Sequence, residues 1–332
     1  MSIKEQLMAN IKDVAKLSGF TVTTVSRMLN NRGYVSESAR QKIKKAMVEL
    51  DYHPNEIARS LSAKRSKMIG LIVPSASNPY FCMIIDAVER YASKVGYKLL
   101  LCNSNREIEK EIEYFRMLNA NRVAGVIVAS RTQDLDRSIR NESLIISIDR
   151  VISPRIPSIC SDNFQGGVLA AEHLIAKGCK MLAHISGSSN LNMDANKRYD
   201  GFKAVCEKHH LPHVVLDAEE EQFYAMNYAD IIAFLLDHYP DVDGIFTSND
   251  VLAAQVVQLC AQRGIRIPEQ MKVVGYDDID MCKLYTPTIT TIHQSVDDIC
   301  RYAVESIVRS EKDAALPNSV VFGVSLIERG TT

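Results

Sequence analysis

Residues 11–30 read IKDVAKLSGFTVTTVSRMLN, and this stretch determines how the N-terminal part of the chain folds. In its first half, side chains recur at the spacing of one helical face, at Ile11, Val14, Ala15 and Ser18. Gly19 then supplies a turn, and Thr21 is a capping-type residue that opens a second helical pattern. That pattern places three apolar side chains on one face, Val25, Met28 and Leu29. The stretch therefore predicts a helix, a tight turn and a second helix.

The residues that follow extend this module by a third helix and a linker. Ser36 can cap the third helix, whose inward side chains would be Ile43, Ala46, Met47 and Leu50. Further on, Pro54 and Asn55 can open a short helix, and the basic stretch up to residue 67 is typical of a linker. We therefore expect a head over residues 9–53, followed by a short helix and linker over 54–67.

A helix, a glycine turn and a second helix with a polar start form the arrangement of a helix-turn-helix motif. In such a motif the second helix lies in the major groove of DNA and its N-terminal side chains meet the base edges. Those side chains would be Val22 and Thr23, with Arg27 one turn further on. Hydroxyl groups suited to phosphate contacts lie beside them, at Thr21, Thr24 and Ser26. The alternative is a small helical bundle with a solvated basic face.

The charge distribution favours an anionic partner for one end of the chain. The net charge is −1, but residues 1–68 carry 13 Lys and Arg against 6 Asp and Glu. The other 264 residues carry 26 against 34. A basic module on an acidic body is the pattern expected of a nucleic-acid-binding head.

From residue 68 onward, short apolar runs alternate with helical segments. We expect strands at 68–73, 98–102, 123–129, 144–148, 181–185, 213–216, 244–247, 272–274 and 320–324. Helices are expected between them, at 79–95, 107–119, 165–177, 197–209, 224–238, 249–263 and 295–310. This alternation predicts an α/β fold of doubly wound parallel sheets, and about 260 residues are too many for one sheet, so two are expected.

Composition and missing motifs exclude several classes of protein. Apolar residues make up 46% and charged residues 24%, and no apolar run is long enough to span a membrane. The charged N-terminus does not resemble a signal peptide, so we expect a cytoplasmic protein with reduced and mostly buried cysteines. We find no P-loop, no G-x-G-x-x-G, no H-E-x-x-H and no G-x-S-x-G, so we expect no catalytic residue, metal or cofactor.

Polar side chains follow several of the predicted strands, where doubly wound folds bind their ligands. Asp149 and Arg150 follow one strand, Asn249 follows another, and Asp277 follows a third. Tyr80 and Phe81 lie just after the first strand. Carboxylates, amides and an arginine beside aromatic rings are the groups that bind a sugar. Each could instead be a loop or capping residue, Asn249 above all, and the carboxylates around Asp277 could belong to an enzyme.

The chain resembles the lactose/galactose repressor (LacI/GalR) family over essentially its whole length. The resemblance rests on residues 11–30, on Val35-Ser36 and on Leu50-Asp-Tyr-His-Pro-Asn-Glu-Ile-Ala-Arg-Ser-Leu61. It continues in Ser77-Asn-Pro-Tyr-Phe81, Gly125-Val-Ile-Val128, Ser248-Asn-Asp250, Gly275-Tyr-Asp-Asp278 and Thr290-Thr-Ile-His-Gln294. The resemblance implies that residues 54–62 form a hinge helix on operator DNA, with Leu61 wedged into the minor groove. It implies further DNA contacts at Asn30, Tyr52 and Asn55. The alternative for Leu61 is packing between subunits.

For the body, the resemblance implies a periplasmic-binding-protein-like fold with an effector in the cleft between two subdomains. The first would comprise residues 68–161 plus 293–322, and the second 162–290 plus 323–332. The chain would cross between them near 160–163, 290–294 and 323–325. The family's effector positions fall on Tyr80, Asp149, Phe164, Asp194, Arg198, Asn249, Asp277 and Gln294.

These observations predict a repressor that binds double-stranded operator DNA as a homodimer and senses a small sugar. Residues 161–167 and 195–199 resemble those of sucrose-operon repressors, which implies sucrose or a related saccharide, with ribose or another hexoside as further candidates. One alternative is a global carbon-catabolite regulator driven by a phosphorylated carrier protein. Another, from a different class, is a sugar-processing enzyme.

Overall fold

The computed structural model of the chain describes residues 9–29, 33–52, 66–130, 132, 135, 144–187, 193–310 and 316–332. The chain divides into two compact units, Met1–Ser66 and Lys67–Thr332. The predicted 54–62 helix, with Asn55 and Leu61, and the predicted contact Asn30 lie outside the described residues.

The first unit contains the three predicted helices, α1 (Ile11–Ser18), α2 (Val22–Leu29) and α3 (Glu37–Glu49). Asn10 caps α1, because its Oδ1 accepts a hydrogen bond from the Lys12 amide at 2.8 Å. Gly19 ends α1 in the left-handed conformation, with φ of 75°, which glycine adopts without a Cβ clash. Ser36 caps α3 as predicted, accepting from the Ala39 amide at 3.3 Å.

The predicted inward faces of these helices form a small core. Its fully or nearly buried members are Val14, Ala15, Val25, Met28, Val35, Ala39, Ile43 and Ala46. The side chains packed partly against them include Leu29, Met47, Leu50 and Tyr52. Because one face of each helix is buried, the opposite face of α2 is left to solvent.

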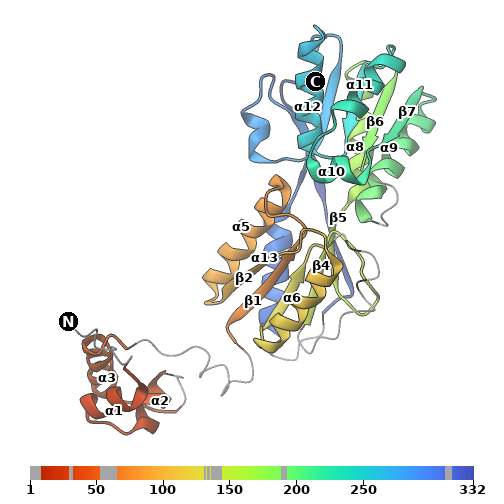
Figure 1. The fold of residues 1–332 in the computed structure, drawn as a ribbon. Coiled ribbons are helices and arrows are strands. Elements are labelled where there is room, and N and C mark those ends of the chain that lie inside the picture. Colours follow the sequence, from red (N-terminus) through yellow and green to blue (C-terminus); the bar gives the residue numbers. More distant parts are fainter. Residues whose placement is uncertain are drawn as a thin grey trace. The chain divides into compact units, whose positions relative to one another are not determined.

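The second unit contains two six-stranded sheets, as the α/β pattern predicts (Figure 1). The first has the order β11-β5-β4-β3-β1-β2, and its neighbouring strands are parallel. Its strands are β1 (Met68–Val73), β2 (Lys98–Asn103), β3 (Gly125–Val128), β4 (Leu144–Ile148), β5 (Ser158–Ser161) and β11 (Ser319–Phe322). The second has the order β12-β10-β9-β8-β6-β7 and is parallel except for the pair β10–β12. Its strands are β6 (Leu182–Ser186), β7 (His213–Asp217), β8 (Gly244–Thr247), β9 (Lys272–Asp277), β10 (Thr290–Gln294) and β12 (Val324–Ile327).

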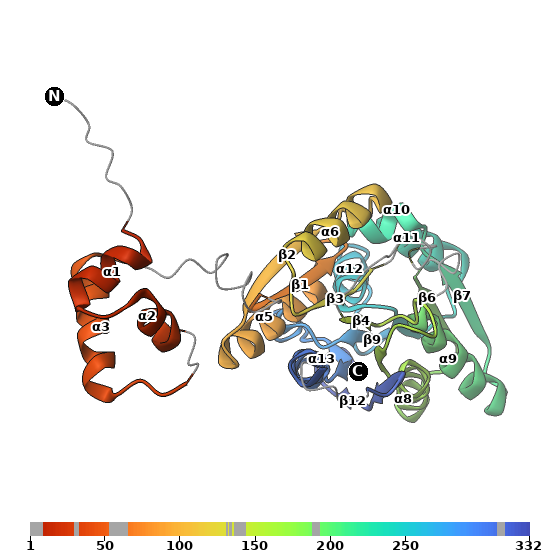
Figure 2. The same ribbon diagram turned by 90° about the horizontal axis from the view of Figure 1, so that it is seen from below.

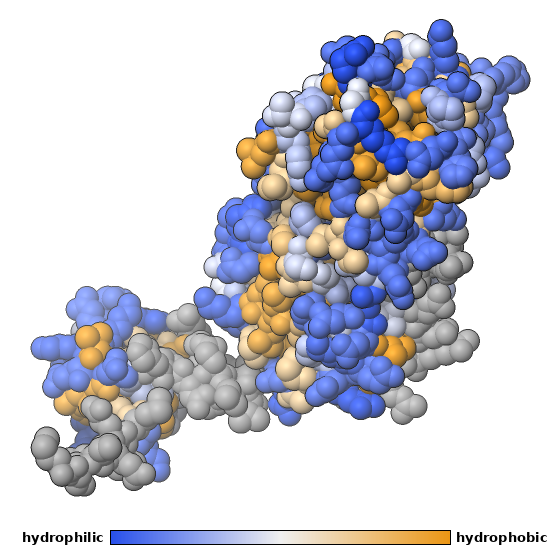
Figure 3. All heavy atoms as spheres, turned by 45° about the horizontal axis from the view of Figure 1, so that its top comes forward, coloured by the Kyte–Doolittle hydropathy of each residue, from blue (hydrophilic) through white to orange (hydrophobic). Residues whose placement is uncertain are grey.

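Helices cover both faces of each sheet (Figure 2). Those of the first sheet are α5 (Pro79–Lys94), α6 (Ile108–Ala120) and α13 (Val296–Ser310). Those of the second are α8 (Asn163–Ala176), α9 (Lys197–Lys208), α10 (Glu220–Ala225), α11 (Ala229–His238) and α12 (Asp250–Gln262), with short 3-10 turns at Asp194–Asn196 and Asp280–Lys283. On the face of the molecule drawn in Figure 3, hydrophilic residues make up most of the surface, as expected for elements that bury their apolar sides inward.

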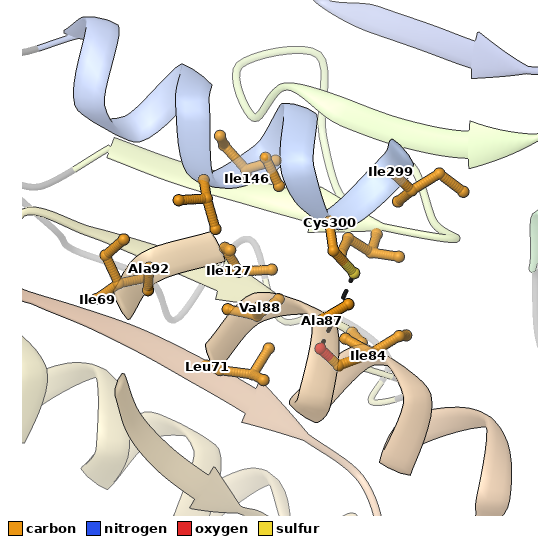
Figure 4. Packing of buried hydrophobic residues seen from close by; sticks show 14 of the residues in the cluster. Ile69, Leu71, Ile84, Ala87, Val88, Ala92, Ile127, Ile146, Ile299 and Cys300 are labelled. Atoms are coloured by element: carbon orange, nitrogen blue, oxygen red, sulfur yellow. Dashed lines mark hydrogen bonds between the residues drawn. The ribbon is translucent and has the colours of Figure 1, made fainter. Parts of the chain in front are cut away.

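The β1 strand shows how one apolar run serves two cores. Its residues Ile69, Leu71 and Val73 pack under α5 and α13, whereas Ile72 packs on the opposite face with the α6 side chains Phe115 and Leu118. The alternation follows from the two-residue period of a strand that is buried on both faces. Figure 4 shows the first of these cores, where the Cys300 thiol of α13 contacts the Ile84 carbonyl of α5 at 3.9 Å.

In the second sheet, α8 and α9 approach each other backbone to backbone. A Cβ added to Gly167 would lie 2.0 Å from the carbonyl oxygen of Arg198, and one added to Gly201 would lie 2.0 Å from that of Phe164. Side chains at these two positions would force the helices apart. The pair of glycines therefore sets where the first turn of α9 lies.

The chain passes between the two sheets at the three predicted places, after β5, after β10 and between β11 and β12 (Figure 1). The sequence analysis ends the longer segment of the second subdomain at residue 290. The second sheet, however, includes the whole of β10, up to Gln294. The boundaries proposed from the resemblance stay a prediction.

Two predicted elements are wrong. The single helix over 224–238 is broken into α10 and α11, because Met226 has a φ of 49°, outside the helical range. The single strand over 320–324 is two strands, β11 and β12, which belong to different sheets and are separated by Gly323. The short strand β5 was not predicted.

The cysteines agree with the sequence analysis, which predicts reduced and mostly buried thiols. Each of the eight cysteines is free, and Cys82 is exposed whereas the other seven are buried. Among the residues that the structure describes, no helix combines the length and the apolar character needed to cross a bilayer.

Candidate functional site

A cleft lies between the two sheets of the second unit, at the carboxyl ends of their strands. It holds about 800 Å³ of space free of protein atoms, part of it open to solvent. The first-sheet side is formed by Asn78, Tyr80, Phe81 and Asp149. The second-sheet side includes His184, Ser186, Met193, Asn196, Arg198, Phe223, Ser248, Asn249 and Asp277. This is the place where doubly wound folds bind small molecules.

On the first-sheet side, Tyr80 and Asp149 form one unit. Tyr80 lies in the first turn of α5, whose N-cap Asn78 accepts from the Tyr80 amide at 3.0 Å. The Tyr80 hydroxyl donates to Asp149 Oδ2. Burial and the nearby carboxylate raise the pKa of Tyr80 well above its usual value, so the hydroxyl stays protonated. Asp149 therefore faces the cleft as an acceptor whose position is fixed by a donor.

On the opposite side, Arg198 is held in the first turns of α9. Its Nε donates to Asn163 Oδ1 at 2.7 Å, and its Nη1 donates to the Ser248 carbonyl at 2.6 Å. The guanidinium lies 3.5 Å from the centre of the Tyr276 ring. These three contacts hold the charge in one orientation, with 8% of the residue exposed.

Asp277 is the last residue of β9 and lies against the same space. Gln294 Nε2 donates to its Oδ1 at 2.6 Å, and its backbone has a φ of 112°, which places it in a region that L-residues rarely adopt. Burial raises the pKa of Asp277 well above its ordinary range, and the charge of Arg198 opposes that shift. The carboxyl is thus a buried acceptor beside a fixed cation.

A third carboxyl group, that of Asp250, lies behind the cleft rather than in its lining. Its Oδ1 accepts from the Thr291 hydroxyl at 2.5 Å and its Oδ2 from the Ile279 amide at 2.9 Å. Burial raises the pKa of Asp250 to about 6. Asp250 therefore ties the loop after β9 to α12 and to β10.

Asn249 combines the two roles that the sequence left open. Its Oδ1 caps α12 by accepting from the Leu252 amide at 2.9 Å, and its Nδ2 donates to the Tyr228 hydroxyl at 3.2 Å. Asn249 also lines the cleft. Asn249 is therefore both the N-cap of α12 and a residue of the cleft lining.

Three of the sequence-predicted effector residues do not belong to the lining of the cleft. Asp194 accepts from Asn163 Nδ2 at 2.9 Å and pairs with Lys197. It therefore holds Asn163 in place, and Asn163 in turn accepts from Arg198. Gln294 reaches the site through its bond to Asp277. Phe164 lies in the first turn of α8 with 43% of its surface exposed.

His184 is a cleft residue that the sequence analysis missed. Its Nδ1 lies 3.0 Å from the Phe246 carbonyl, which can only accept, so Nδ1 carries the hydrogen. Burial and the charge of Arg198 lower the pKa of His184 to about 3, so the ring is neutral and its Nε2 is an acceptor. His184 is the middle residue of β6, so the rule that found Asp149, which looks for polar residues after a strand, does not find it.

Phe223 was missed because its helix, α10, was not predicted as a separate element. It adds a ring to the second-sheet side of the cleft. The neighbouring Tyr224 crosses to the first-sheet side, where the Arg106 guanidinium lies 3.1 Å from the centre of its ring. The other missed polar residues of the lining are Asn78, Ser186, Asn196 and Ser248.

In the first unit, the predicted base-contacting residues share an exposed face of α2. Val22 is 40% exposed, and Thr23 and Arg27 are exposed as well. Thr21 and Thr24 are joined by a hydroxyl contact of 2.9 Å, and Thr21 Oγ1 accepts from the Thr24 amide. Ser26 is half-buried beside them, and Tyr52 packs partly against the head's core. The exposed side chains of Val22, Thr23 and Arg27 can therefore contact base edges.

The described residues contain no cluster of His, Cys, Asp or Glu that could hold a metal ion. The cleft offers fixed donors, fixed acceptors and rings. Such a set suits the binding of a hydroxyl-rich molecule.

Two family descriptions match the chain. Residues 10–55 match "Bacterial regulatory proteins, lacI family", and residues 171–332 match "Periplasmic binding protein-like domain".

Relatives resemble the chain over nearly its whole length. A ribose operon repressor of Halalkalibacterium halodurans is 37% identical over 91% of this chain and 90% of its own. A sucrose operon repressor of Streptococcus mutans is 36% identical over 97% and 98%. Among solved structures, the lac repressor dimer bound to operator and an anti-inducer superposes with a TM-score of 0.85 at 25% identity, covering 97% of this chain and 98% of that one. With the observed fold, these similarities lead to one conclusion: the chain belongs to the lacI family of bacterial regulatory proteins.

Proposed function

We propose that this protein is a transcriptional repressor that binds operator DNA as a homodimer and responds to a small sugar in its cleft. The relatives include a sucrose operon repressor and a ribose operon repressor. These names favour sucrose, a related saccharide or ribose as the effector. The regulator acts by binding and not as an enzyme.

The observation that carries this proposal is the composition of the cleft. Tyr80 and Asp149 on one side and Arg198, Asn249 and Asp277 on the other are the predicted effector residues that line it. Planar polar groups bind sugar hydroxyls in pairs, and the rings of Tyr80, Phe81 and Phe223 can cover the apolar faces of the sugar. Asp194 and Gln294 act through their neighbours Asn163 and Asp277.

For the DNA side, the proposal assigns base contacts to Val22, Thr23 and Arg27. Phosphate contacts are assigned to the hydroxyl groups of Thr21, Thr24 and Ser26, and further contacts to Asn30, Tyr52, Asn55 and Leu61. The exposed face of α2 and the excess of positive charge in residues 1–68 support this assignment.

The coupling between the two sites follows from the three chain crossings. A sugar that contacts both sides of the cleft changes the angle between the subdomains, which we assign to residues 68–161 plus 293–322 and 162–290 plus 323–332. That change moves the start of β1 in each subunit and sets whether the 54–62 segments of a dimer can pair on DNA. A ligand shifts such an equilibrium only by its difference in affinity for the two states.

Two further functions fit the cleft less well. A sugar-processing enzyme would need a general acid and a base on opposite sides of a scissile bond, whereas Asp277 is engaged by Gln294 and Asp149 by Tyr80. A regulator driven only by a phosphorylated carrier protein would not require this set of fixed sugar-binding groups.

The experiment is a thermal-denaturation screen of the full chain with D-ribose, sucrose, D-fructose and D-glucose, followed by DNA binding. The DNA is a duplex selected by the protein from a randomised pool. We expect at least one sugar to raise the melting temperature by mass action and to change the affinity for the selected duplex. Sugar binding with unchanged DNA affinity would refute the proposed coupling.

A further inference from the structure

We propose that Arg106 and Tyr224 form a latch across the cleft, which raises the affinity for the sugar without contacting it. The latch is the contact between the Arg106 guanidinium on the first-sheet side and the Tyr224 ring on the second-sheet side. This inference rests on the proposed sugar-sensing function and specifies how the closure of that site is regulated.

The latch joins two elements that belong to different sheets. Arg106 lies in the loop between β2 and α6, and Tyr224 lies in α10, between β7 and β8. The guanidinium carbon is 3.1 Å from the centre of the Tyr224 ring, where a cation is attracted to the face of an aromatic ring. Neither residue belongs to the lining of the main cleft. Opening of the cleft would therefore separate the two groups, whether or not a sugar is bound.

Arg106 is positioned by a buried carboxyl group on the first-sheet side. Its amide donates to Ser104 Oγ at 3.3 Å, and the Ser104 hydroxyl donates to Glu111 Oε1 at 3.0 Å. Glu111 is fully buried in α6, and its Oε2 accepts from the Ser130 hydroxyl at 2.8 Å. Asn105 and Arg106 have φ of 49° and 68°, a left-handed conformation that persists where surrounding contacts impose it. The loop is thus anchored to the core of the first-sheet side.

Tyr224 is positioned from the second-sheet side by α12. Gln255 of α12 donates through Nε2 to the Met226 carbonyl at 2.6 Å and accepts through Oε1 from the Tyr228 amide at 2.8 Å. These two bonds fix the end of α10. The rings of Phe223 and Tyr224 also meet edge to face, with 5.4 Å between their centres. Because both partners of the latch are held in place, its formation costs little conformational entropy.

Beside the latch, α10 approaches the first-sheet side at the border of the main cleft. A crevice with about 240 Å³ of space free of protein atoms, part of it open to solvent, lies between them. Tyr224 lines this crevice, which shares Asn78, Phe81 and Phe223 with the lining of the main cleft. The latch therefore lies next to the proposed sugar site, and the two close together.

The latch stabilises only the closed arrangement of the cleft. A sugar that contacts both sides binds that arrangement, so its apparent affinity is proportional to the fraction of the protein that is closed. Arg106 is exposed and Tyr224 is half-buried, which makes the contact a partly hydrated one. Its loss should lower the sugar affinity by about three- to tenfold, the size expected of such a contact.

The first experiment is a double-mutant cycle on sugar affinity. D-Ribose, sucrose, D-fructose and D-glucose are each titrated calorimetrically into the full chain as wild type, Arg106→Gln, Tyr224→Leu and the double variant. We expect each single variant to bind about three- to tenfold more weakly and the double variant to bind like either one, because the contact is lost only once. Unchanged affinity in the single variants, or losses that add up in the double variant, would overturn the latch.

The matched control is Arg116→Gln. It removes an exposed arginine of α6 that lines neither the main cleft nor the crevice, so it changes the net charge of the chain equally. Its sugar affinity should equal that of the wild type. A loss as large as that of Arg106→Gln would assign the effect to net charge and overturn the latch.

Ser104→Ala tests the anchor of the latch. It removes the oxygen that accepts from the Arg106 amide, so sugar binding should weaken in the wild-type background. It should change nothing in the Arg106→Gln background, because the latch is already lost there. An equal loss in both backgrounds would show that Ser104 acts independently of Arg106 and would remove the anchor from the inference.

Hydrogen exchange without sugar tests the latch separately from the sugar-sensing function. In α10 the Asn227 amide donates to the Gln222 carbonyl at 3.0 Å, and in the loop the Ser104 amide donates to the Val73 carbonyl at 2.9 Å. Arg106→Gln should raise the exchange rate of residues 219–227 roughly twofold or more, and Tyr224→Leu should do the same for residues 103–107. Unchanged exchange in both segments would overturn the latch. If none of the four sugars binds the wild type, the proposed function fails and this measurement alone decides whether the latch exists.

Discussion

Gly167→Ala should destabilise the protein and weaken the effector site together, because α9 carries Arg198. The new Cβ would lie 2.0 Å from the Arg198 carbonyl oxygen, whereas ordinary contact begins at 3.4 Å, so the backbones must separate by roughly 1.4 Å. Overpacking of this kind costs about 1–3 kcal/mol, and the backbone contact places this site at the upper end. The higher helix propensity of alanine offsets about 1 kcal/mol. We therefore expect a net loss of about 2 kcal/mol in the free energy of unfolding.

The assay is urea unfolding of the full chain followed by far-ultraviolet circular dichroism, with sugar affinity measured in parallel. Gly201→Ala should lose a similar amount, because its Cβ would meet the Phe164 carbonyl at 2.0 Å. The double variant should lose less than the sum, since helices already forced apart make room for the second methyl group. Gly323→Ala is the matched control, because a Cβ there meets no atom within 4 Å. A Gly167→Ala protein as stable as the wild type would refute the close approach of the two helices.

Three further predictions address the DNA contacts, the pH dependence and the assembly. Arg27→Ala should lower the ratio of operator to random-DNA affinity. Lys64→Ala and Lys67→Ala should instead weaken binding to both DNAs alike and make the affinity depend less on salt. Fluorescence anisotropy titrations of both DNAs at several salt concentrations measure these two effects. Burial raises the pKa of Asp250 from 3.8 to about 6, so the native state holds this proton more tightly than the unfolded state. The contribution of this proton to the free energy of unfolding is therefore fully present below about pH 4. It is lost as the pH rises through 6, and the free energy of unfolding falls by up to about 3 kcal/mol. Urea titrations of Asp250→Asn should show that part of the pH dependence removed, and an unaltered pH profile would assign it to other groups. Sedimentation equilibrium at micromolar concentration should give twice the chain mass of 37.1 kDa, and a mass near four times that value would contradict the homodimer.

The sequence was sufficient where local signals and tertiary structure agree. The helices of the head were predicted from the face formed by Val14, Val25 and Met28 together with the signals at Gly19 and Ser36, and each of those signals acts within a few residues. The buried parallel strands were found for a similar reason, since a strand covered on both faces is a short apolar run.

The sequence was insufficient where an element depends on distant partners. The strand β5 is recognised by its pairing with β4 and β11, and its residues SICS carry a weak apolar signal. The switch from β11 to β12 at Gly323 depends on which sheet each strand joins, and that choice is made by tertiary packing. A continuous run of helix formers hid the break at Met226.

The same distinction applies to the site. Tyr80, Asp149, Asn249 and Asp277 were identifiable because they come after predicted strands, and the structure brings them to one cleft. The acceptor role of His184 depends on the Phe246 carbonyl, which is 62 residues away and fixes the tautomer. The supporting contacts among Asn163, Arg198 and Asp194 likewise join separate elements of the second subdomain.

The most direct test of the account is the affinity of the full chain for its selected operator duplex, measured with and without a saturating neutral sugar. The wild type should change its operator affinity by about 5–150-fold, the usual range of allosteric coupling. Arg198→Ala should bind the duplex like the sugar-free wild type and should show no response to the sugar, because its head is unaltered and its cleft has lost a fixed donor. A wild type that binds the sugar but keeps the same operator affinity, or an Arg198→Ala variant that responds fully, would contradict the account.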